Sequence, residues 1–95
     1  MVSQQGNEYL QSVEVANAYG LHARPAAEFV KLANRYAAEI LVAKDGLEVN
    51  GKSIMGVMML AADRGSTLEI KACGADAEEA VKALVKLVAE GFGEA

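Results

Sequence analysis

The chain carries its single histidine and its single proline within one short stretch, Tyr19 to Phe29, which reads YGLHARPAAEF. Pro25 indicates that a helix begins near Ala23, because proline is tolerated in the first helical turn. His22 would then lie just before the helix, beside backbone N–H groups that have no partner within it. The sequence therefore places an imidazole at a potential anion site, with the Arg24 guanidinium close by.

Phosphoryl transfer is the chemistry that such a site would support. The positive end of the helix dipole disfavours the imidazolium, so we expect the ring of His22 to be neutral and nucleophilic near pH 7. A phosphoryl group on that ring could be bound by the N–H groups and by Arg24. A solvated histidine without a chemical role is the alternative, and the residues alone leave it open. With one histidine the chain offers no metal cluster and no catalytic triad, so we expect neither a metal nor a cofactor.

The composition is typical of one small domain. Ninety-five residues can close a single modest core, so we expect one domain over residues 1–95, with a mobile N-terminus up to about residue 8 and a short tail at residues 92–95. The net charge of −4, with lysines and arginines dispersed singly, argues against nucleic acid as a partner. No apolar stretch reaches membrane-spanning length, so we expect no insertion into a membrane.

Cys73 is the only cysteine of the chain. A single cysteine excludes an internal disulfide and fits a reducing compartment, so we expect the protein to be cytoplasmic. In the segment EIKACGA we expect Cys73 to lie at a strand end as a small, buried apolar residue.

Alternation of apolar and polar residues predicts a strand over residues 10–15 and another over residues 66–72. Two further β-type runs, residues 39–44 and 47–50, are joined through Asp45-Gly46, a pair typical of a hairpin. We therefore expect four strands.

Three segments favour helices. The first begins near Ala23 and its expected core positions are Ala26, Phe29, Val30, Ala33 and Ala37. Within residues 54–60 a short helix opened by Ser53 competes with a strand, and we favour the helix. The last helix begins with Asp76 as its N-cap and Glu79 as the partner in a capping box, and it ends at Gly91.

The order β-α-β-β-α-β-α predicts an α+β, open-faced β-sandwich in which helices cover one face of an antiparallel sheet. Such a fold lacks a deep pocket, so function is expected on helix ends and loops. The same pattern also permits a ferredoxin-like effector-binding or acyl-phosphate-hydrolysing domain. We rank that function last, because the segment LHARPA is not followed by a phosphate-cradling loop.

Two segments, GLHARPAAEFV at residues 20–30 and NGKSIMGVMMLAA at residues 50–62, closely resemble HPr, the histidine-containing phosphocarrier family of the bacterial phosphoenolpyruvate:sugar phosphotransferase system. The resemblance implies a four-stranded sheet of order 1-4-2-3 covered by three helices. It also implies that His22 accepts a phosphoryl group on Nδ1 from phosphorylated enzyme I and passes it to enzyme IIA-type acceptors, with Arg24 positioning the phosphate. The longer segment GLHARPAAEFVKLANRY, residues 20–36, is somewhat closer to the nitrogen-related branch of the family. We expect the protein to be a monomer.

Ser53 has two interpretations. Its hydroxyl is a good N-cap for the short helix that follows. The resemblance implies instead a regulatory serine, phosphorylated by an HPr kinase/phosphorylase and read by a transcriptional regulator. A phosphate there would add negative charge to the docking face.

The apolar run after Ser53 is larger than a short helix can bury. We expect Val57 and Leu60 in the core, and an exposed docking patch of Ile54, Met55 and Met58. For each methionine a place in the core is the alternative. A second functional hypothesis follows: a regulatory binding module that acts through Ser53 and this patch, with His22 idle.

Overall fold

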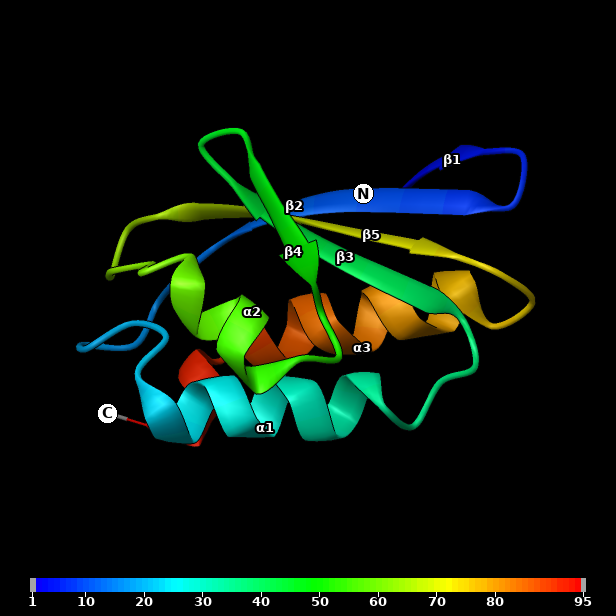
Figure 1. Cartoon of the computed structure of the whole chain (residues 1–95). Helices are drawn as coiled ribbons and strands as arrows, with labels where there is room; N and C mark the ends of the chain where they lie inside the picture. The colour runs from blue at the N-terminus through cyan, green and yellow to red at the C-terminus, as the bar shows by residue number, and fades with distance from the viewer. Residues whose placement is uncertain (1, 95) are drawn as a thin grey trace.

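Three helices cover one face of an antiparallel sheet in the computed structural model of the protein, which describes residues 2–94 (Figure 1). The strands are β1 (Ser3–Gln5), β2 (Glu8–Glu14), β3 (Glu39–Lys44), β4 (Leu47–Asn50) and β5 (Thr67–Cys73). The helices are α1 (Ala23–Ala33), α2 (Ile54–Met59) and α3 (Ala77–Ala89), and one turn of 3-10 helix, η1 (Gly91–Gly93), follows α3.

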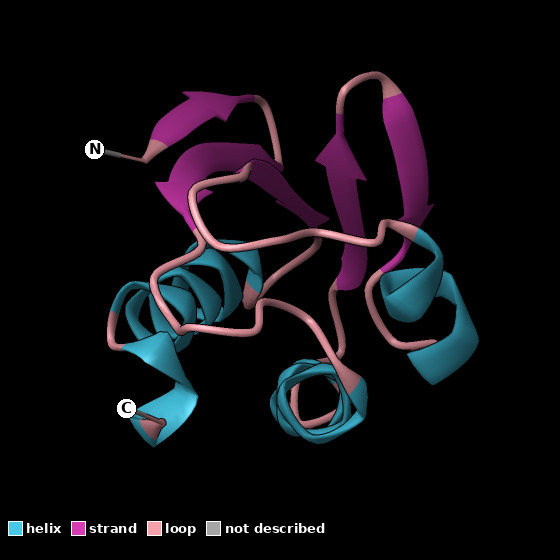
Figure 2. Ribbon diagram, turned by 90° about the vertical axis from the view of Figure 1, so that its left-hand side faces the viewer, coloured by secondary structure: helices cyan, strands magenta, loops and turns pink. Residues whose placement is uncertain are grey.

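The sheet has the strand order β1-β2-β5-β3-β4, and all neighbouring strands are antiparallel. The four strands predicted from the sequence are β2, β3, β4 and β5, and their expected order is confirmed. The open-faced α+β sandwich is confirmed as well, because Figure 2 shows the strands in one layer and the helices together beneath it.

Strand β1 corrects the expected count of four strands, and it lies in the segment expected to be mobile. It pairs with β2 across a tight turn at Gly6, whose φ is 62°, and Gln4 Nε2 donates to the Gly6 carbonyl at 2.9 Å. All residues of β1 are exposed. It therefore shows no alternation of apolar side chains, which is the signal that reveals a strand in a sequence.

Alternate residues of the sheet point into a single core. In β5, Leu68 and Ile70 are fully buried while Glu69 between them is exposed. Phe29 of α1 and Leu84 of α3 are fully buried on the helical side of the same core. Burying one such side chain contributes about 2 kcal/mol, so the covered face of the sheet holds the helices in place.

Helix α1 ends earlier than its periodicity predicts. Its last residue is Ala33, and the side-chain Nδ2 of Asn34 donates to the carbonyl of Val30 at 2.9 Å. Ala37, expected on the core face of this helix, lies beyond the helix and is exposed. The reason is that asparagine competes for backbone hydrogen bonds and so favours a helix end over a helix interior.

Two further expectations are confirmed in position and wrong in detail: Cys73 ends β5 but is not buried, and Asp76 is the N-cap residue of α3 but does not cap it through its side chain. Cys73 is exposed, because alternation along β5 places it on the outer face of the sheet, opposite to the buried Ala72. Asp76 precedes α3 but makes no capping hydrogen bond. Its carboxylate accepts instead from the N–H groups of Ala37 at 2.9 Å and Ala38 at 2.8 Å, and so ties the start of α3 to the segment before β3. The hydrogen bond from Ala37 is the main cause that lowers the pKa of Asp76.

The turn that precedes α1 is held against the loop that follows α2. Leu21 is buried and its N–H donates to the Ala62 carbonyl at 2.8 Å. Gly20 adopts a φ of 66°, and a Cβ at this position would collide with the Ala62 carbonyl oxygen. Glycine is therefore required just before His22, both for conformation and for space.

Within residues 2–94, none of the helices combines the length and the apolar character that a bilayer crossing requires.

Replacing Gly20 with Ala is expected to lower the free energy of unfolding by more than about 2 kcal/mol, since strain and overlap add. Urea unfolding measures this loss. Gly6→Ala is the matched control, because Gly6 has a similar φ of 62° with open space around it, and should lose only about 1 kcal/mol. Equal losses of unfolding free energy in the two variants would show that the close approach of Gly20 to Ala62 does not affect stability.

The depressed pKa of Asp76 predicts a pH-dependent contribution to stability. The carboxylate stabilises the fold above the range in which a free aspartate titrates, about pH 4, and this contribution is lost as the pH falls through the lower folded pKa. Asp76→Asn should therefore lower the thermal midpoint at pH 7, and its difference from the unaltered protein should shrink on acidification toward pH 3. Asp63→Asn, at an exposed aspartate, is the control. A deficit independent of pH would contradict the assignment.

Candidate functional site

His22 is the N-cap residue of α1. Its backbone is extended, with φ −72° and ψ −175°, and its side chain makes no capping hydrogen bond. The carbonyl of His22 accepts the N–H of Ala26 at 3.0 Å, which begins the helical pattern. The side chain is 41% exposed, and the first turn of α1 contains no acidic residue. The imidazole is thus accessible at the positive end of an 11-residue helix.

The C-terminal segment brings a carboxylate to this imidazole. Oε1 of Glu94 lies 3.1 Å from Nε2 of His22, and Oε2 lies 3.9 Å from Nη1 of Arg24. The Glu94 side chain is only 16% exposed, whereas that of Arg24 is 75% exposed. Figure 1 lets the reader follow how the end of the chain returns to the start of α1. We call His22, Arg24 and Glu94 the His22 site.

Asn17 supports the site from beneath. It is 1% exposed, and its Nδ2 donates to the Gly20 carbonyl at 2.7 Å and to Oε1 of Glu94 at 3.1 Å. One amide thus links the turn before His22 to the tail that reaches His22. Both partners of Nδ2 are acceptors, which fixes the orientation of the amide.

The charges define which nitrogen of His22 is free. The hydrogen bond with His22 is the main cause that lowers the pKa of Glu94, and the hydrogen bond from Asn17 and the charge of Arg24 act in the same direction. Glu94 is therefore ionised at neutral pH and can only accept. The contact with Nε2 requires the proton on that nitrogen, so in the neutral ring Nδ1 carries the lone pair.

The tail reaches the site through an unusual backbone. Gly91, Phe92 and Gly93 have consecutive φ values of 65°, 57° and 73°. Two glycines take this left-handed region readily, whereas Phe92 is held there by burial, at 8% exposure. The buried ring anchors the tail, and Glu94 follows two residues later. The sequence places a tail at residues 92–95, and the structure shows that it packs as far as Glu94.

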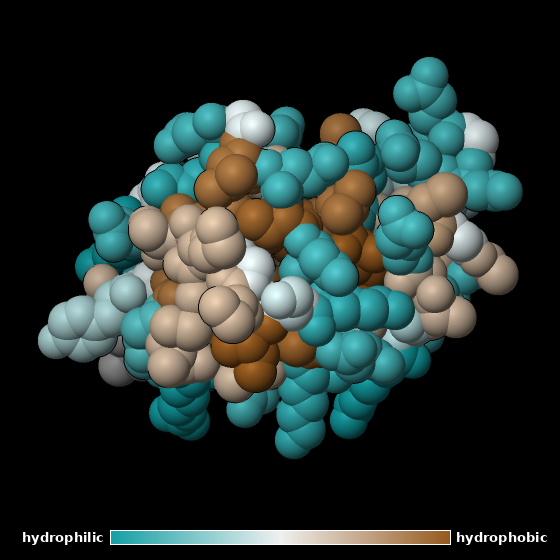
Figure 3. Space-filling view, viewed as in Figure 1, coloured by the Kyte–Doolittle hydropathy of each residue, from teal (hydrophilic) through white to brown (hydrophobic). Residues whose placement is uncertain are grey.

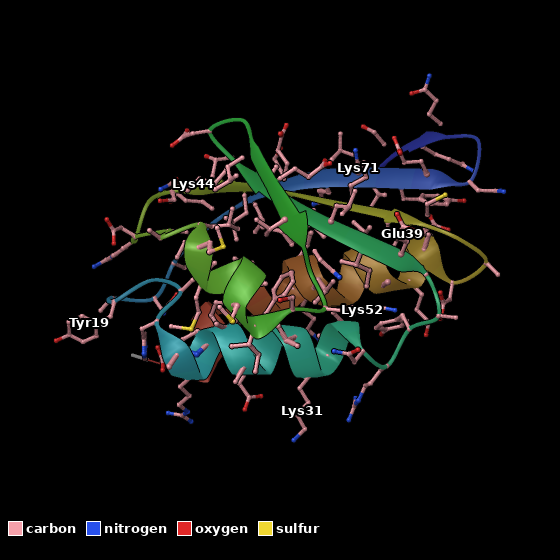
Figure 4. The ribbon with its side chains drawn as sticks, viewed as in Figure 1. Tyr19, Lys31, Glu39, Lys44, Lys52 and Lys71 are labelled. Carbon is pink, nitrogen blue, oxygen red and sulfur yellow. The ribbon has the colours of Figure 1, made fainter. Side chains whose placement is uncertain are left out.

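Tyr19 lies on the solvent side of His22. Figure 4 shows its side chain extending away from the body of the molecule, and it is 82% exposed. Its ring is edge-on to the imidazole, with 6.3 Å between centroids and 85° between planes. Such a contact favours one orientation of the His22 ring and leaves the ring accessible.

Ser53 caps α2, as the sequence predicts. Its backbone is extended and its Oγ accepts the N–H of Gly56 at 3.1 Å. The hydroxyl is half-buried at the start of a six-residue helix.

Helix α2 exposes apolar side chains. Val57 and Leu60 are buried, as expected, whereas four neighbours are exposed. We call these four the α2 patch: Ile54 at 46%, Met55 at 77%, Met58 at 41% and Met59 at 66% exposure. In Figure 3 beige and brown side chains gather over α2. Because α1 and α2 pack against each other, the patch lies beside the helix that begins at His22.

The structure brings together His22 and Arg24, which the sequence singles out, and adds Glu94 and Asn17, which it does not. In the sequence, Glu94 is an acidic residue in the tail and Asn17 is an asparagine before a glycine turn. Neither residue belongs to a periodic pattern or a motif that would have singled it out. Ser53 and the α2 patch belong to the neighbouring helix. Among residues 2–94 there is no group of three or more histidine, cysteine or acidic side chains that could hold a metal ion.

Comparisons with known proteins identify relatives of this arrangement. The family model described as the PTS HPr component phosphorylation site matches residues 10–90. The chain is 48% identical to the phosphocarrier protein HPr of Neisseria meningitidis over 84 residues, which cover 88% of this chain and 94% of that protein.

Solved structures agree with this similarity. An HPr from Thermoanaerobacter tengcongensis superposes with a TM-score of 0.87 at 48% identity and covers 90% of this chain and 97% of its own. Crh of Bacillus subtilis, whose crystal structure is described as a swapped dimer, has a TM-score of 0.71 at 44% identity over 96% of this chain and 97% of its own.

The family model spans most of the chain and contains the helix start at His22. The relatives match over nearly their full length, and their fold is the one described above. The protein belongs to the HPr family of the bacterial phosphotransferase system.

Proposed function

We propose that the protein is a phosphocarrier that accepts a phosphoryl group on Nδ1 of His22 from phosphorylated enzyme I and passes it to an enzyme IIA-type acceptor. The observation that carries this proposal is the His22 site itself. The imidazole is exposed at a helix start, and its Nε2 is engaged by Glu94 at 3.1 Å, which leaves Nδ1 as the nucleophilic atom. The phosphocarrier relatives support the same assignment.

Arg24 is the residue that would bind the phosphoryl group. Its guanidinium is 75% exposed, and its pairing with Glu94 is at the long distance of 3.9 Å. So loose a pair costs little to separate, because exposed ion pairs contribute between about 0 and 1 kcal/mol. Arg24 can therefore turn to the phosphoryl oxygens, which suit a planar guanidinium.

The protein acts as a carrier and has no turnover of its own, because the site holds a phosphoryl acceptor and an anion-binding group on an open surface. It functions as a monomer, since one chain supplies His22, Arg24 and Glu94. Its proposed partners, enzyme I and the acceptors, favour a cytoplasmic location. Assays with sugar-specific and nitrogen-related acceptors decide which branch it serves.

Partners dock on the α2 patch. Ile54, Met55 and Met58, together with Met59, offer flexible apolar side chains that can adapt to more than one partner. Small interfaces of modest affinity suit a carrier that must release each partner.

The second candidate function is a regulatory binding module, which the likeness to Crh favours. It would use Ser53, phosphorylated by an HPr kinase/phosphorylase, and the α2 patch to engage a transcriptional regulator. The two functions are compatible in one chain, and they predict phosphate on different residues.

Incubation with a bacterial enzyme I and phosphoenolpyruvate, followed by intact mass, tests the phosphocarrier function. We expect the addition of one acid-labile phosphate to the unaltered chain and none to His22→Ala, because only that ring supplies the nucleophile. Ser53→Ala is the matched control and should be phosphorylated normally. No addition from enzyme I, or only acid-stable phosphate on Ser53 in a parallel incubation with an HPr kinase/phosphorylase and its phosphoryl donor, would move the protein to the regulatory class. A far-UV spectrum must show that His22→Ala is folded.

Variants at Ser53 separate its capping role from an effect of charge. Aspartate is as good an N-cap as serine, whereas alanine removes the cap and costs about 1 kcal/mol of stability. Ser53→Asp should therefore keep the stability of the fold and weaken docking of enzyme I, measured as a higher KM, since it adds a charge beside the α2 patch. Ser53→Ala should instead lower the stability of the fold and leave the KM unchanged, because it removes the cap and adds no charge. An unchanged KM in Ser53→Asp would exclude the charge effect.

A further inference from the structure

We infer that Glu94 is a positioning residue for phosphoryl transfer, held by Asn17, which keeps the proton of the neutral His22 ring on Nε2 and the lone pair on Nδ1. The inference rests on the proposed phosphocarrier function. It assigns a role to a tail residue that lies 72 positions from His22 in the sequence.

The contacts form a chain of three side chains. Nδ2 of Asn17 has two hydrogens and two acceptors, the Gly20 carbonyl at 2.7 Å and Oε1 of Glu94 at 3.1 Å. The same Oε1 lies 3.1 Å from Nε2 of His22. Asn17 is fully enclosed and Glu94 is 16% exposed, so the carboxylate is held more firmly than an exposed side chain would be. This is the geometry by which a carboxylate orients a histidine and selects its tautomer.

The backbone of the tail supports the same role. Phe92 takes a left-handed φ of 57° and is nonetheless buried, so its packing holds a conformation that costs about 1 kcal/mol or more. A Cβ at Gly91 would lie 3.5 Å from Cβ of Asn17, which shows that the tail runs alongside Asn17. The anchor places Glu94 where both Asn17 and His22 can reach it.

Phosphoryl transfer to Nδ1 requires no movement of the proton on Nε2. The Nδ1 lone pair attacks phosphorus, the new N–P bond forms, and the bond from phosphorus to the donor breaks with its electron pair leaving on the donor. The ring then carries a positive charge with its proton still on Nε2, directly against the Glu94 carboxylate. Transfer to an acceptor reverses these steps and returns the neutral ring with the same tautomer. Glu94 thus accepts the hydrogen bond from Nε2 in both the neutral ring and the phosphorylated, positively charged ring.

Among residues 2–94, Glu94 is the side chain that makes a hydrogen bond with the ring, Tyr19 packs against the ring, and Arg24 pairs with Glu94. Arg24 offers no acceptor for the Nε2 proton, because a guanidinium only donates, and Tyr19 meets the imidazole in a T-shaped ring contact at 6.3 Å between centroids, not in a hydrogen bond. Glu94 is therefore the group that selects the tautomer.

The test is ¹⁵N NMR of the His22 ring in the full chain at about pH 8.5, where a free imidazole is neutral. The unaltered protein and Glu94→Gln, which keeps an acceptor oxygen, should show the Nε2–H tautomer. Glu94→Ala should raise the Nδ1–H population at least about fivefold, as loss of a charged hydrogen bond predicts. Glu90→Ala is the matched control, because Glu90 is exposed at the end of α3 and should leave the ring unchanged.

Transfer kinetics with enzyme I give a second readout. Glu94→Ala should lower kcat about fivefold with little change in KM, and Glu94→Gln should lower kcat less, since it restores the tautomer but not the charge. An unchanged tautomer ratio in a folded Glu94→Ala variant would overturn the inference, as would an unchanged kcat. Absence of phosphate from His22 in the unaltered chain would instead overturn the proposed function, and the NMR comparison does not depend on enzyme I.

Discussion

Burial of one face of the sheet is the constraint on which the rest of the structure depends. Leu68 and Ile70 of the central strand β5 point to the same side, and both are buried in the core that the helices cover. Their burial sets where α1 lies, and the bond from Leu21 to Ala62 then sets where α1 begins. The other face of the sheet is not covered by a helix in the part of the chain that the structure describes. The exposed His22 at the start of α1 is where we propose that the chemistry occurs.

The His22 site is built from both ends of the chain. The N-terminal part contributes Asn17 and His22 around a turn that needs glycine, and the C-terminal part contributes Glu94 after an anchored, left-handed Phe92. Neither part is chemically complete alone. An imidazole at a helix start can adopt either neutral tautomer. A tail carboxylate without His22 would be an ordinary surface acid. Their contact distinguishes the two ring nitrogens: Nε2 meets the carboxylate, and Nδ1 is the atom that we propose to bind phosphorus.

Separate helices divide the work of a carrier in this fold. The start of α1 presents the His22 ring, which we propose as the reacting group, while α2 presents exposed apolar side chains on which we propose that partners dock. Ser53 lies at the start of α2, where its hydroxyl already stabilises the helix. A negative charge at that position would be compatible with the helix dipole and would alter the docking face, so regulation and capping can share one residue. Membership of the HPr family is consistent with this division.

The sequence by itself determined the local features: the helix start at His22 and Pro25, the Ser53 cap, the buried Val57 and the alternation of the long strands. These follow from neighbours within four residues and leave a period or a motif. Motif resemblance added the family and the strand order. Only the tertiary structure decided the rest, including the pairing of the exposed strand β1, the bonds of Asp76 to Ala37 and Ala38, and the exposure of Cys73. The contact of Glu94 with His22 belongs to the same group, because it joins residues 72 positions apart and depends on where the folded core brings the two ends of the chain.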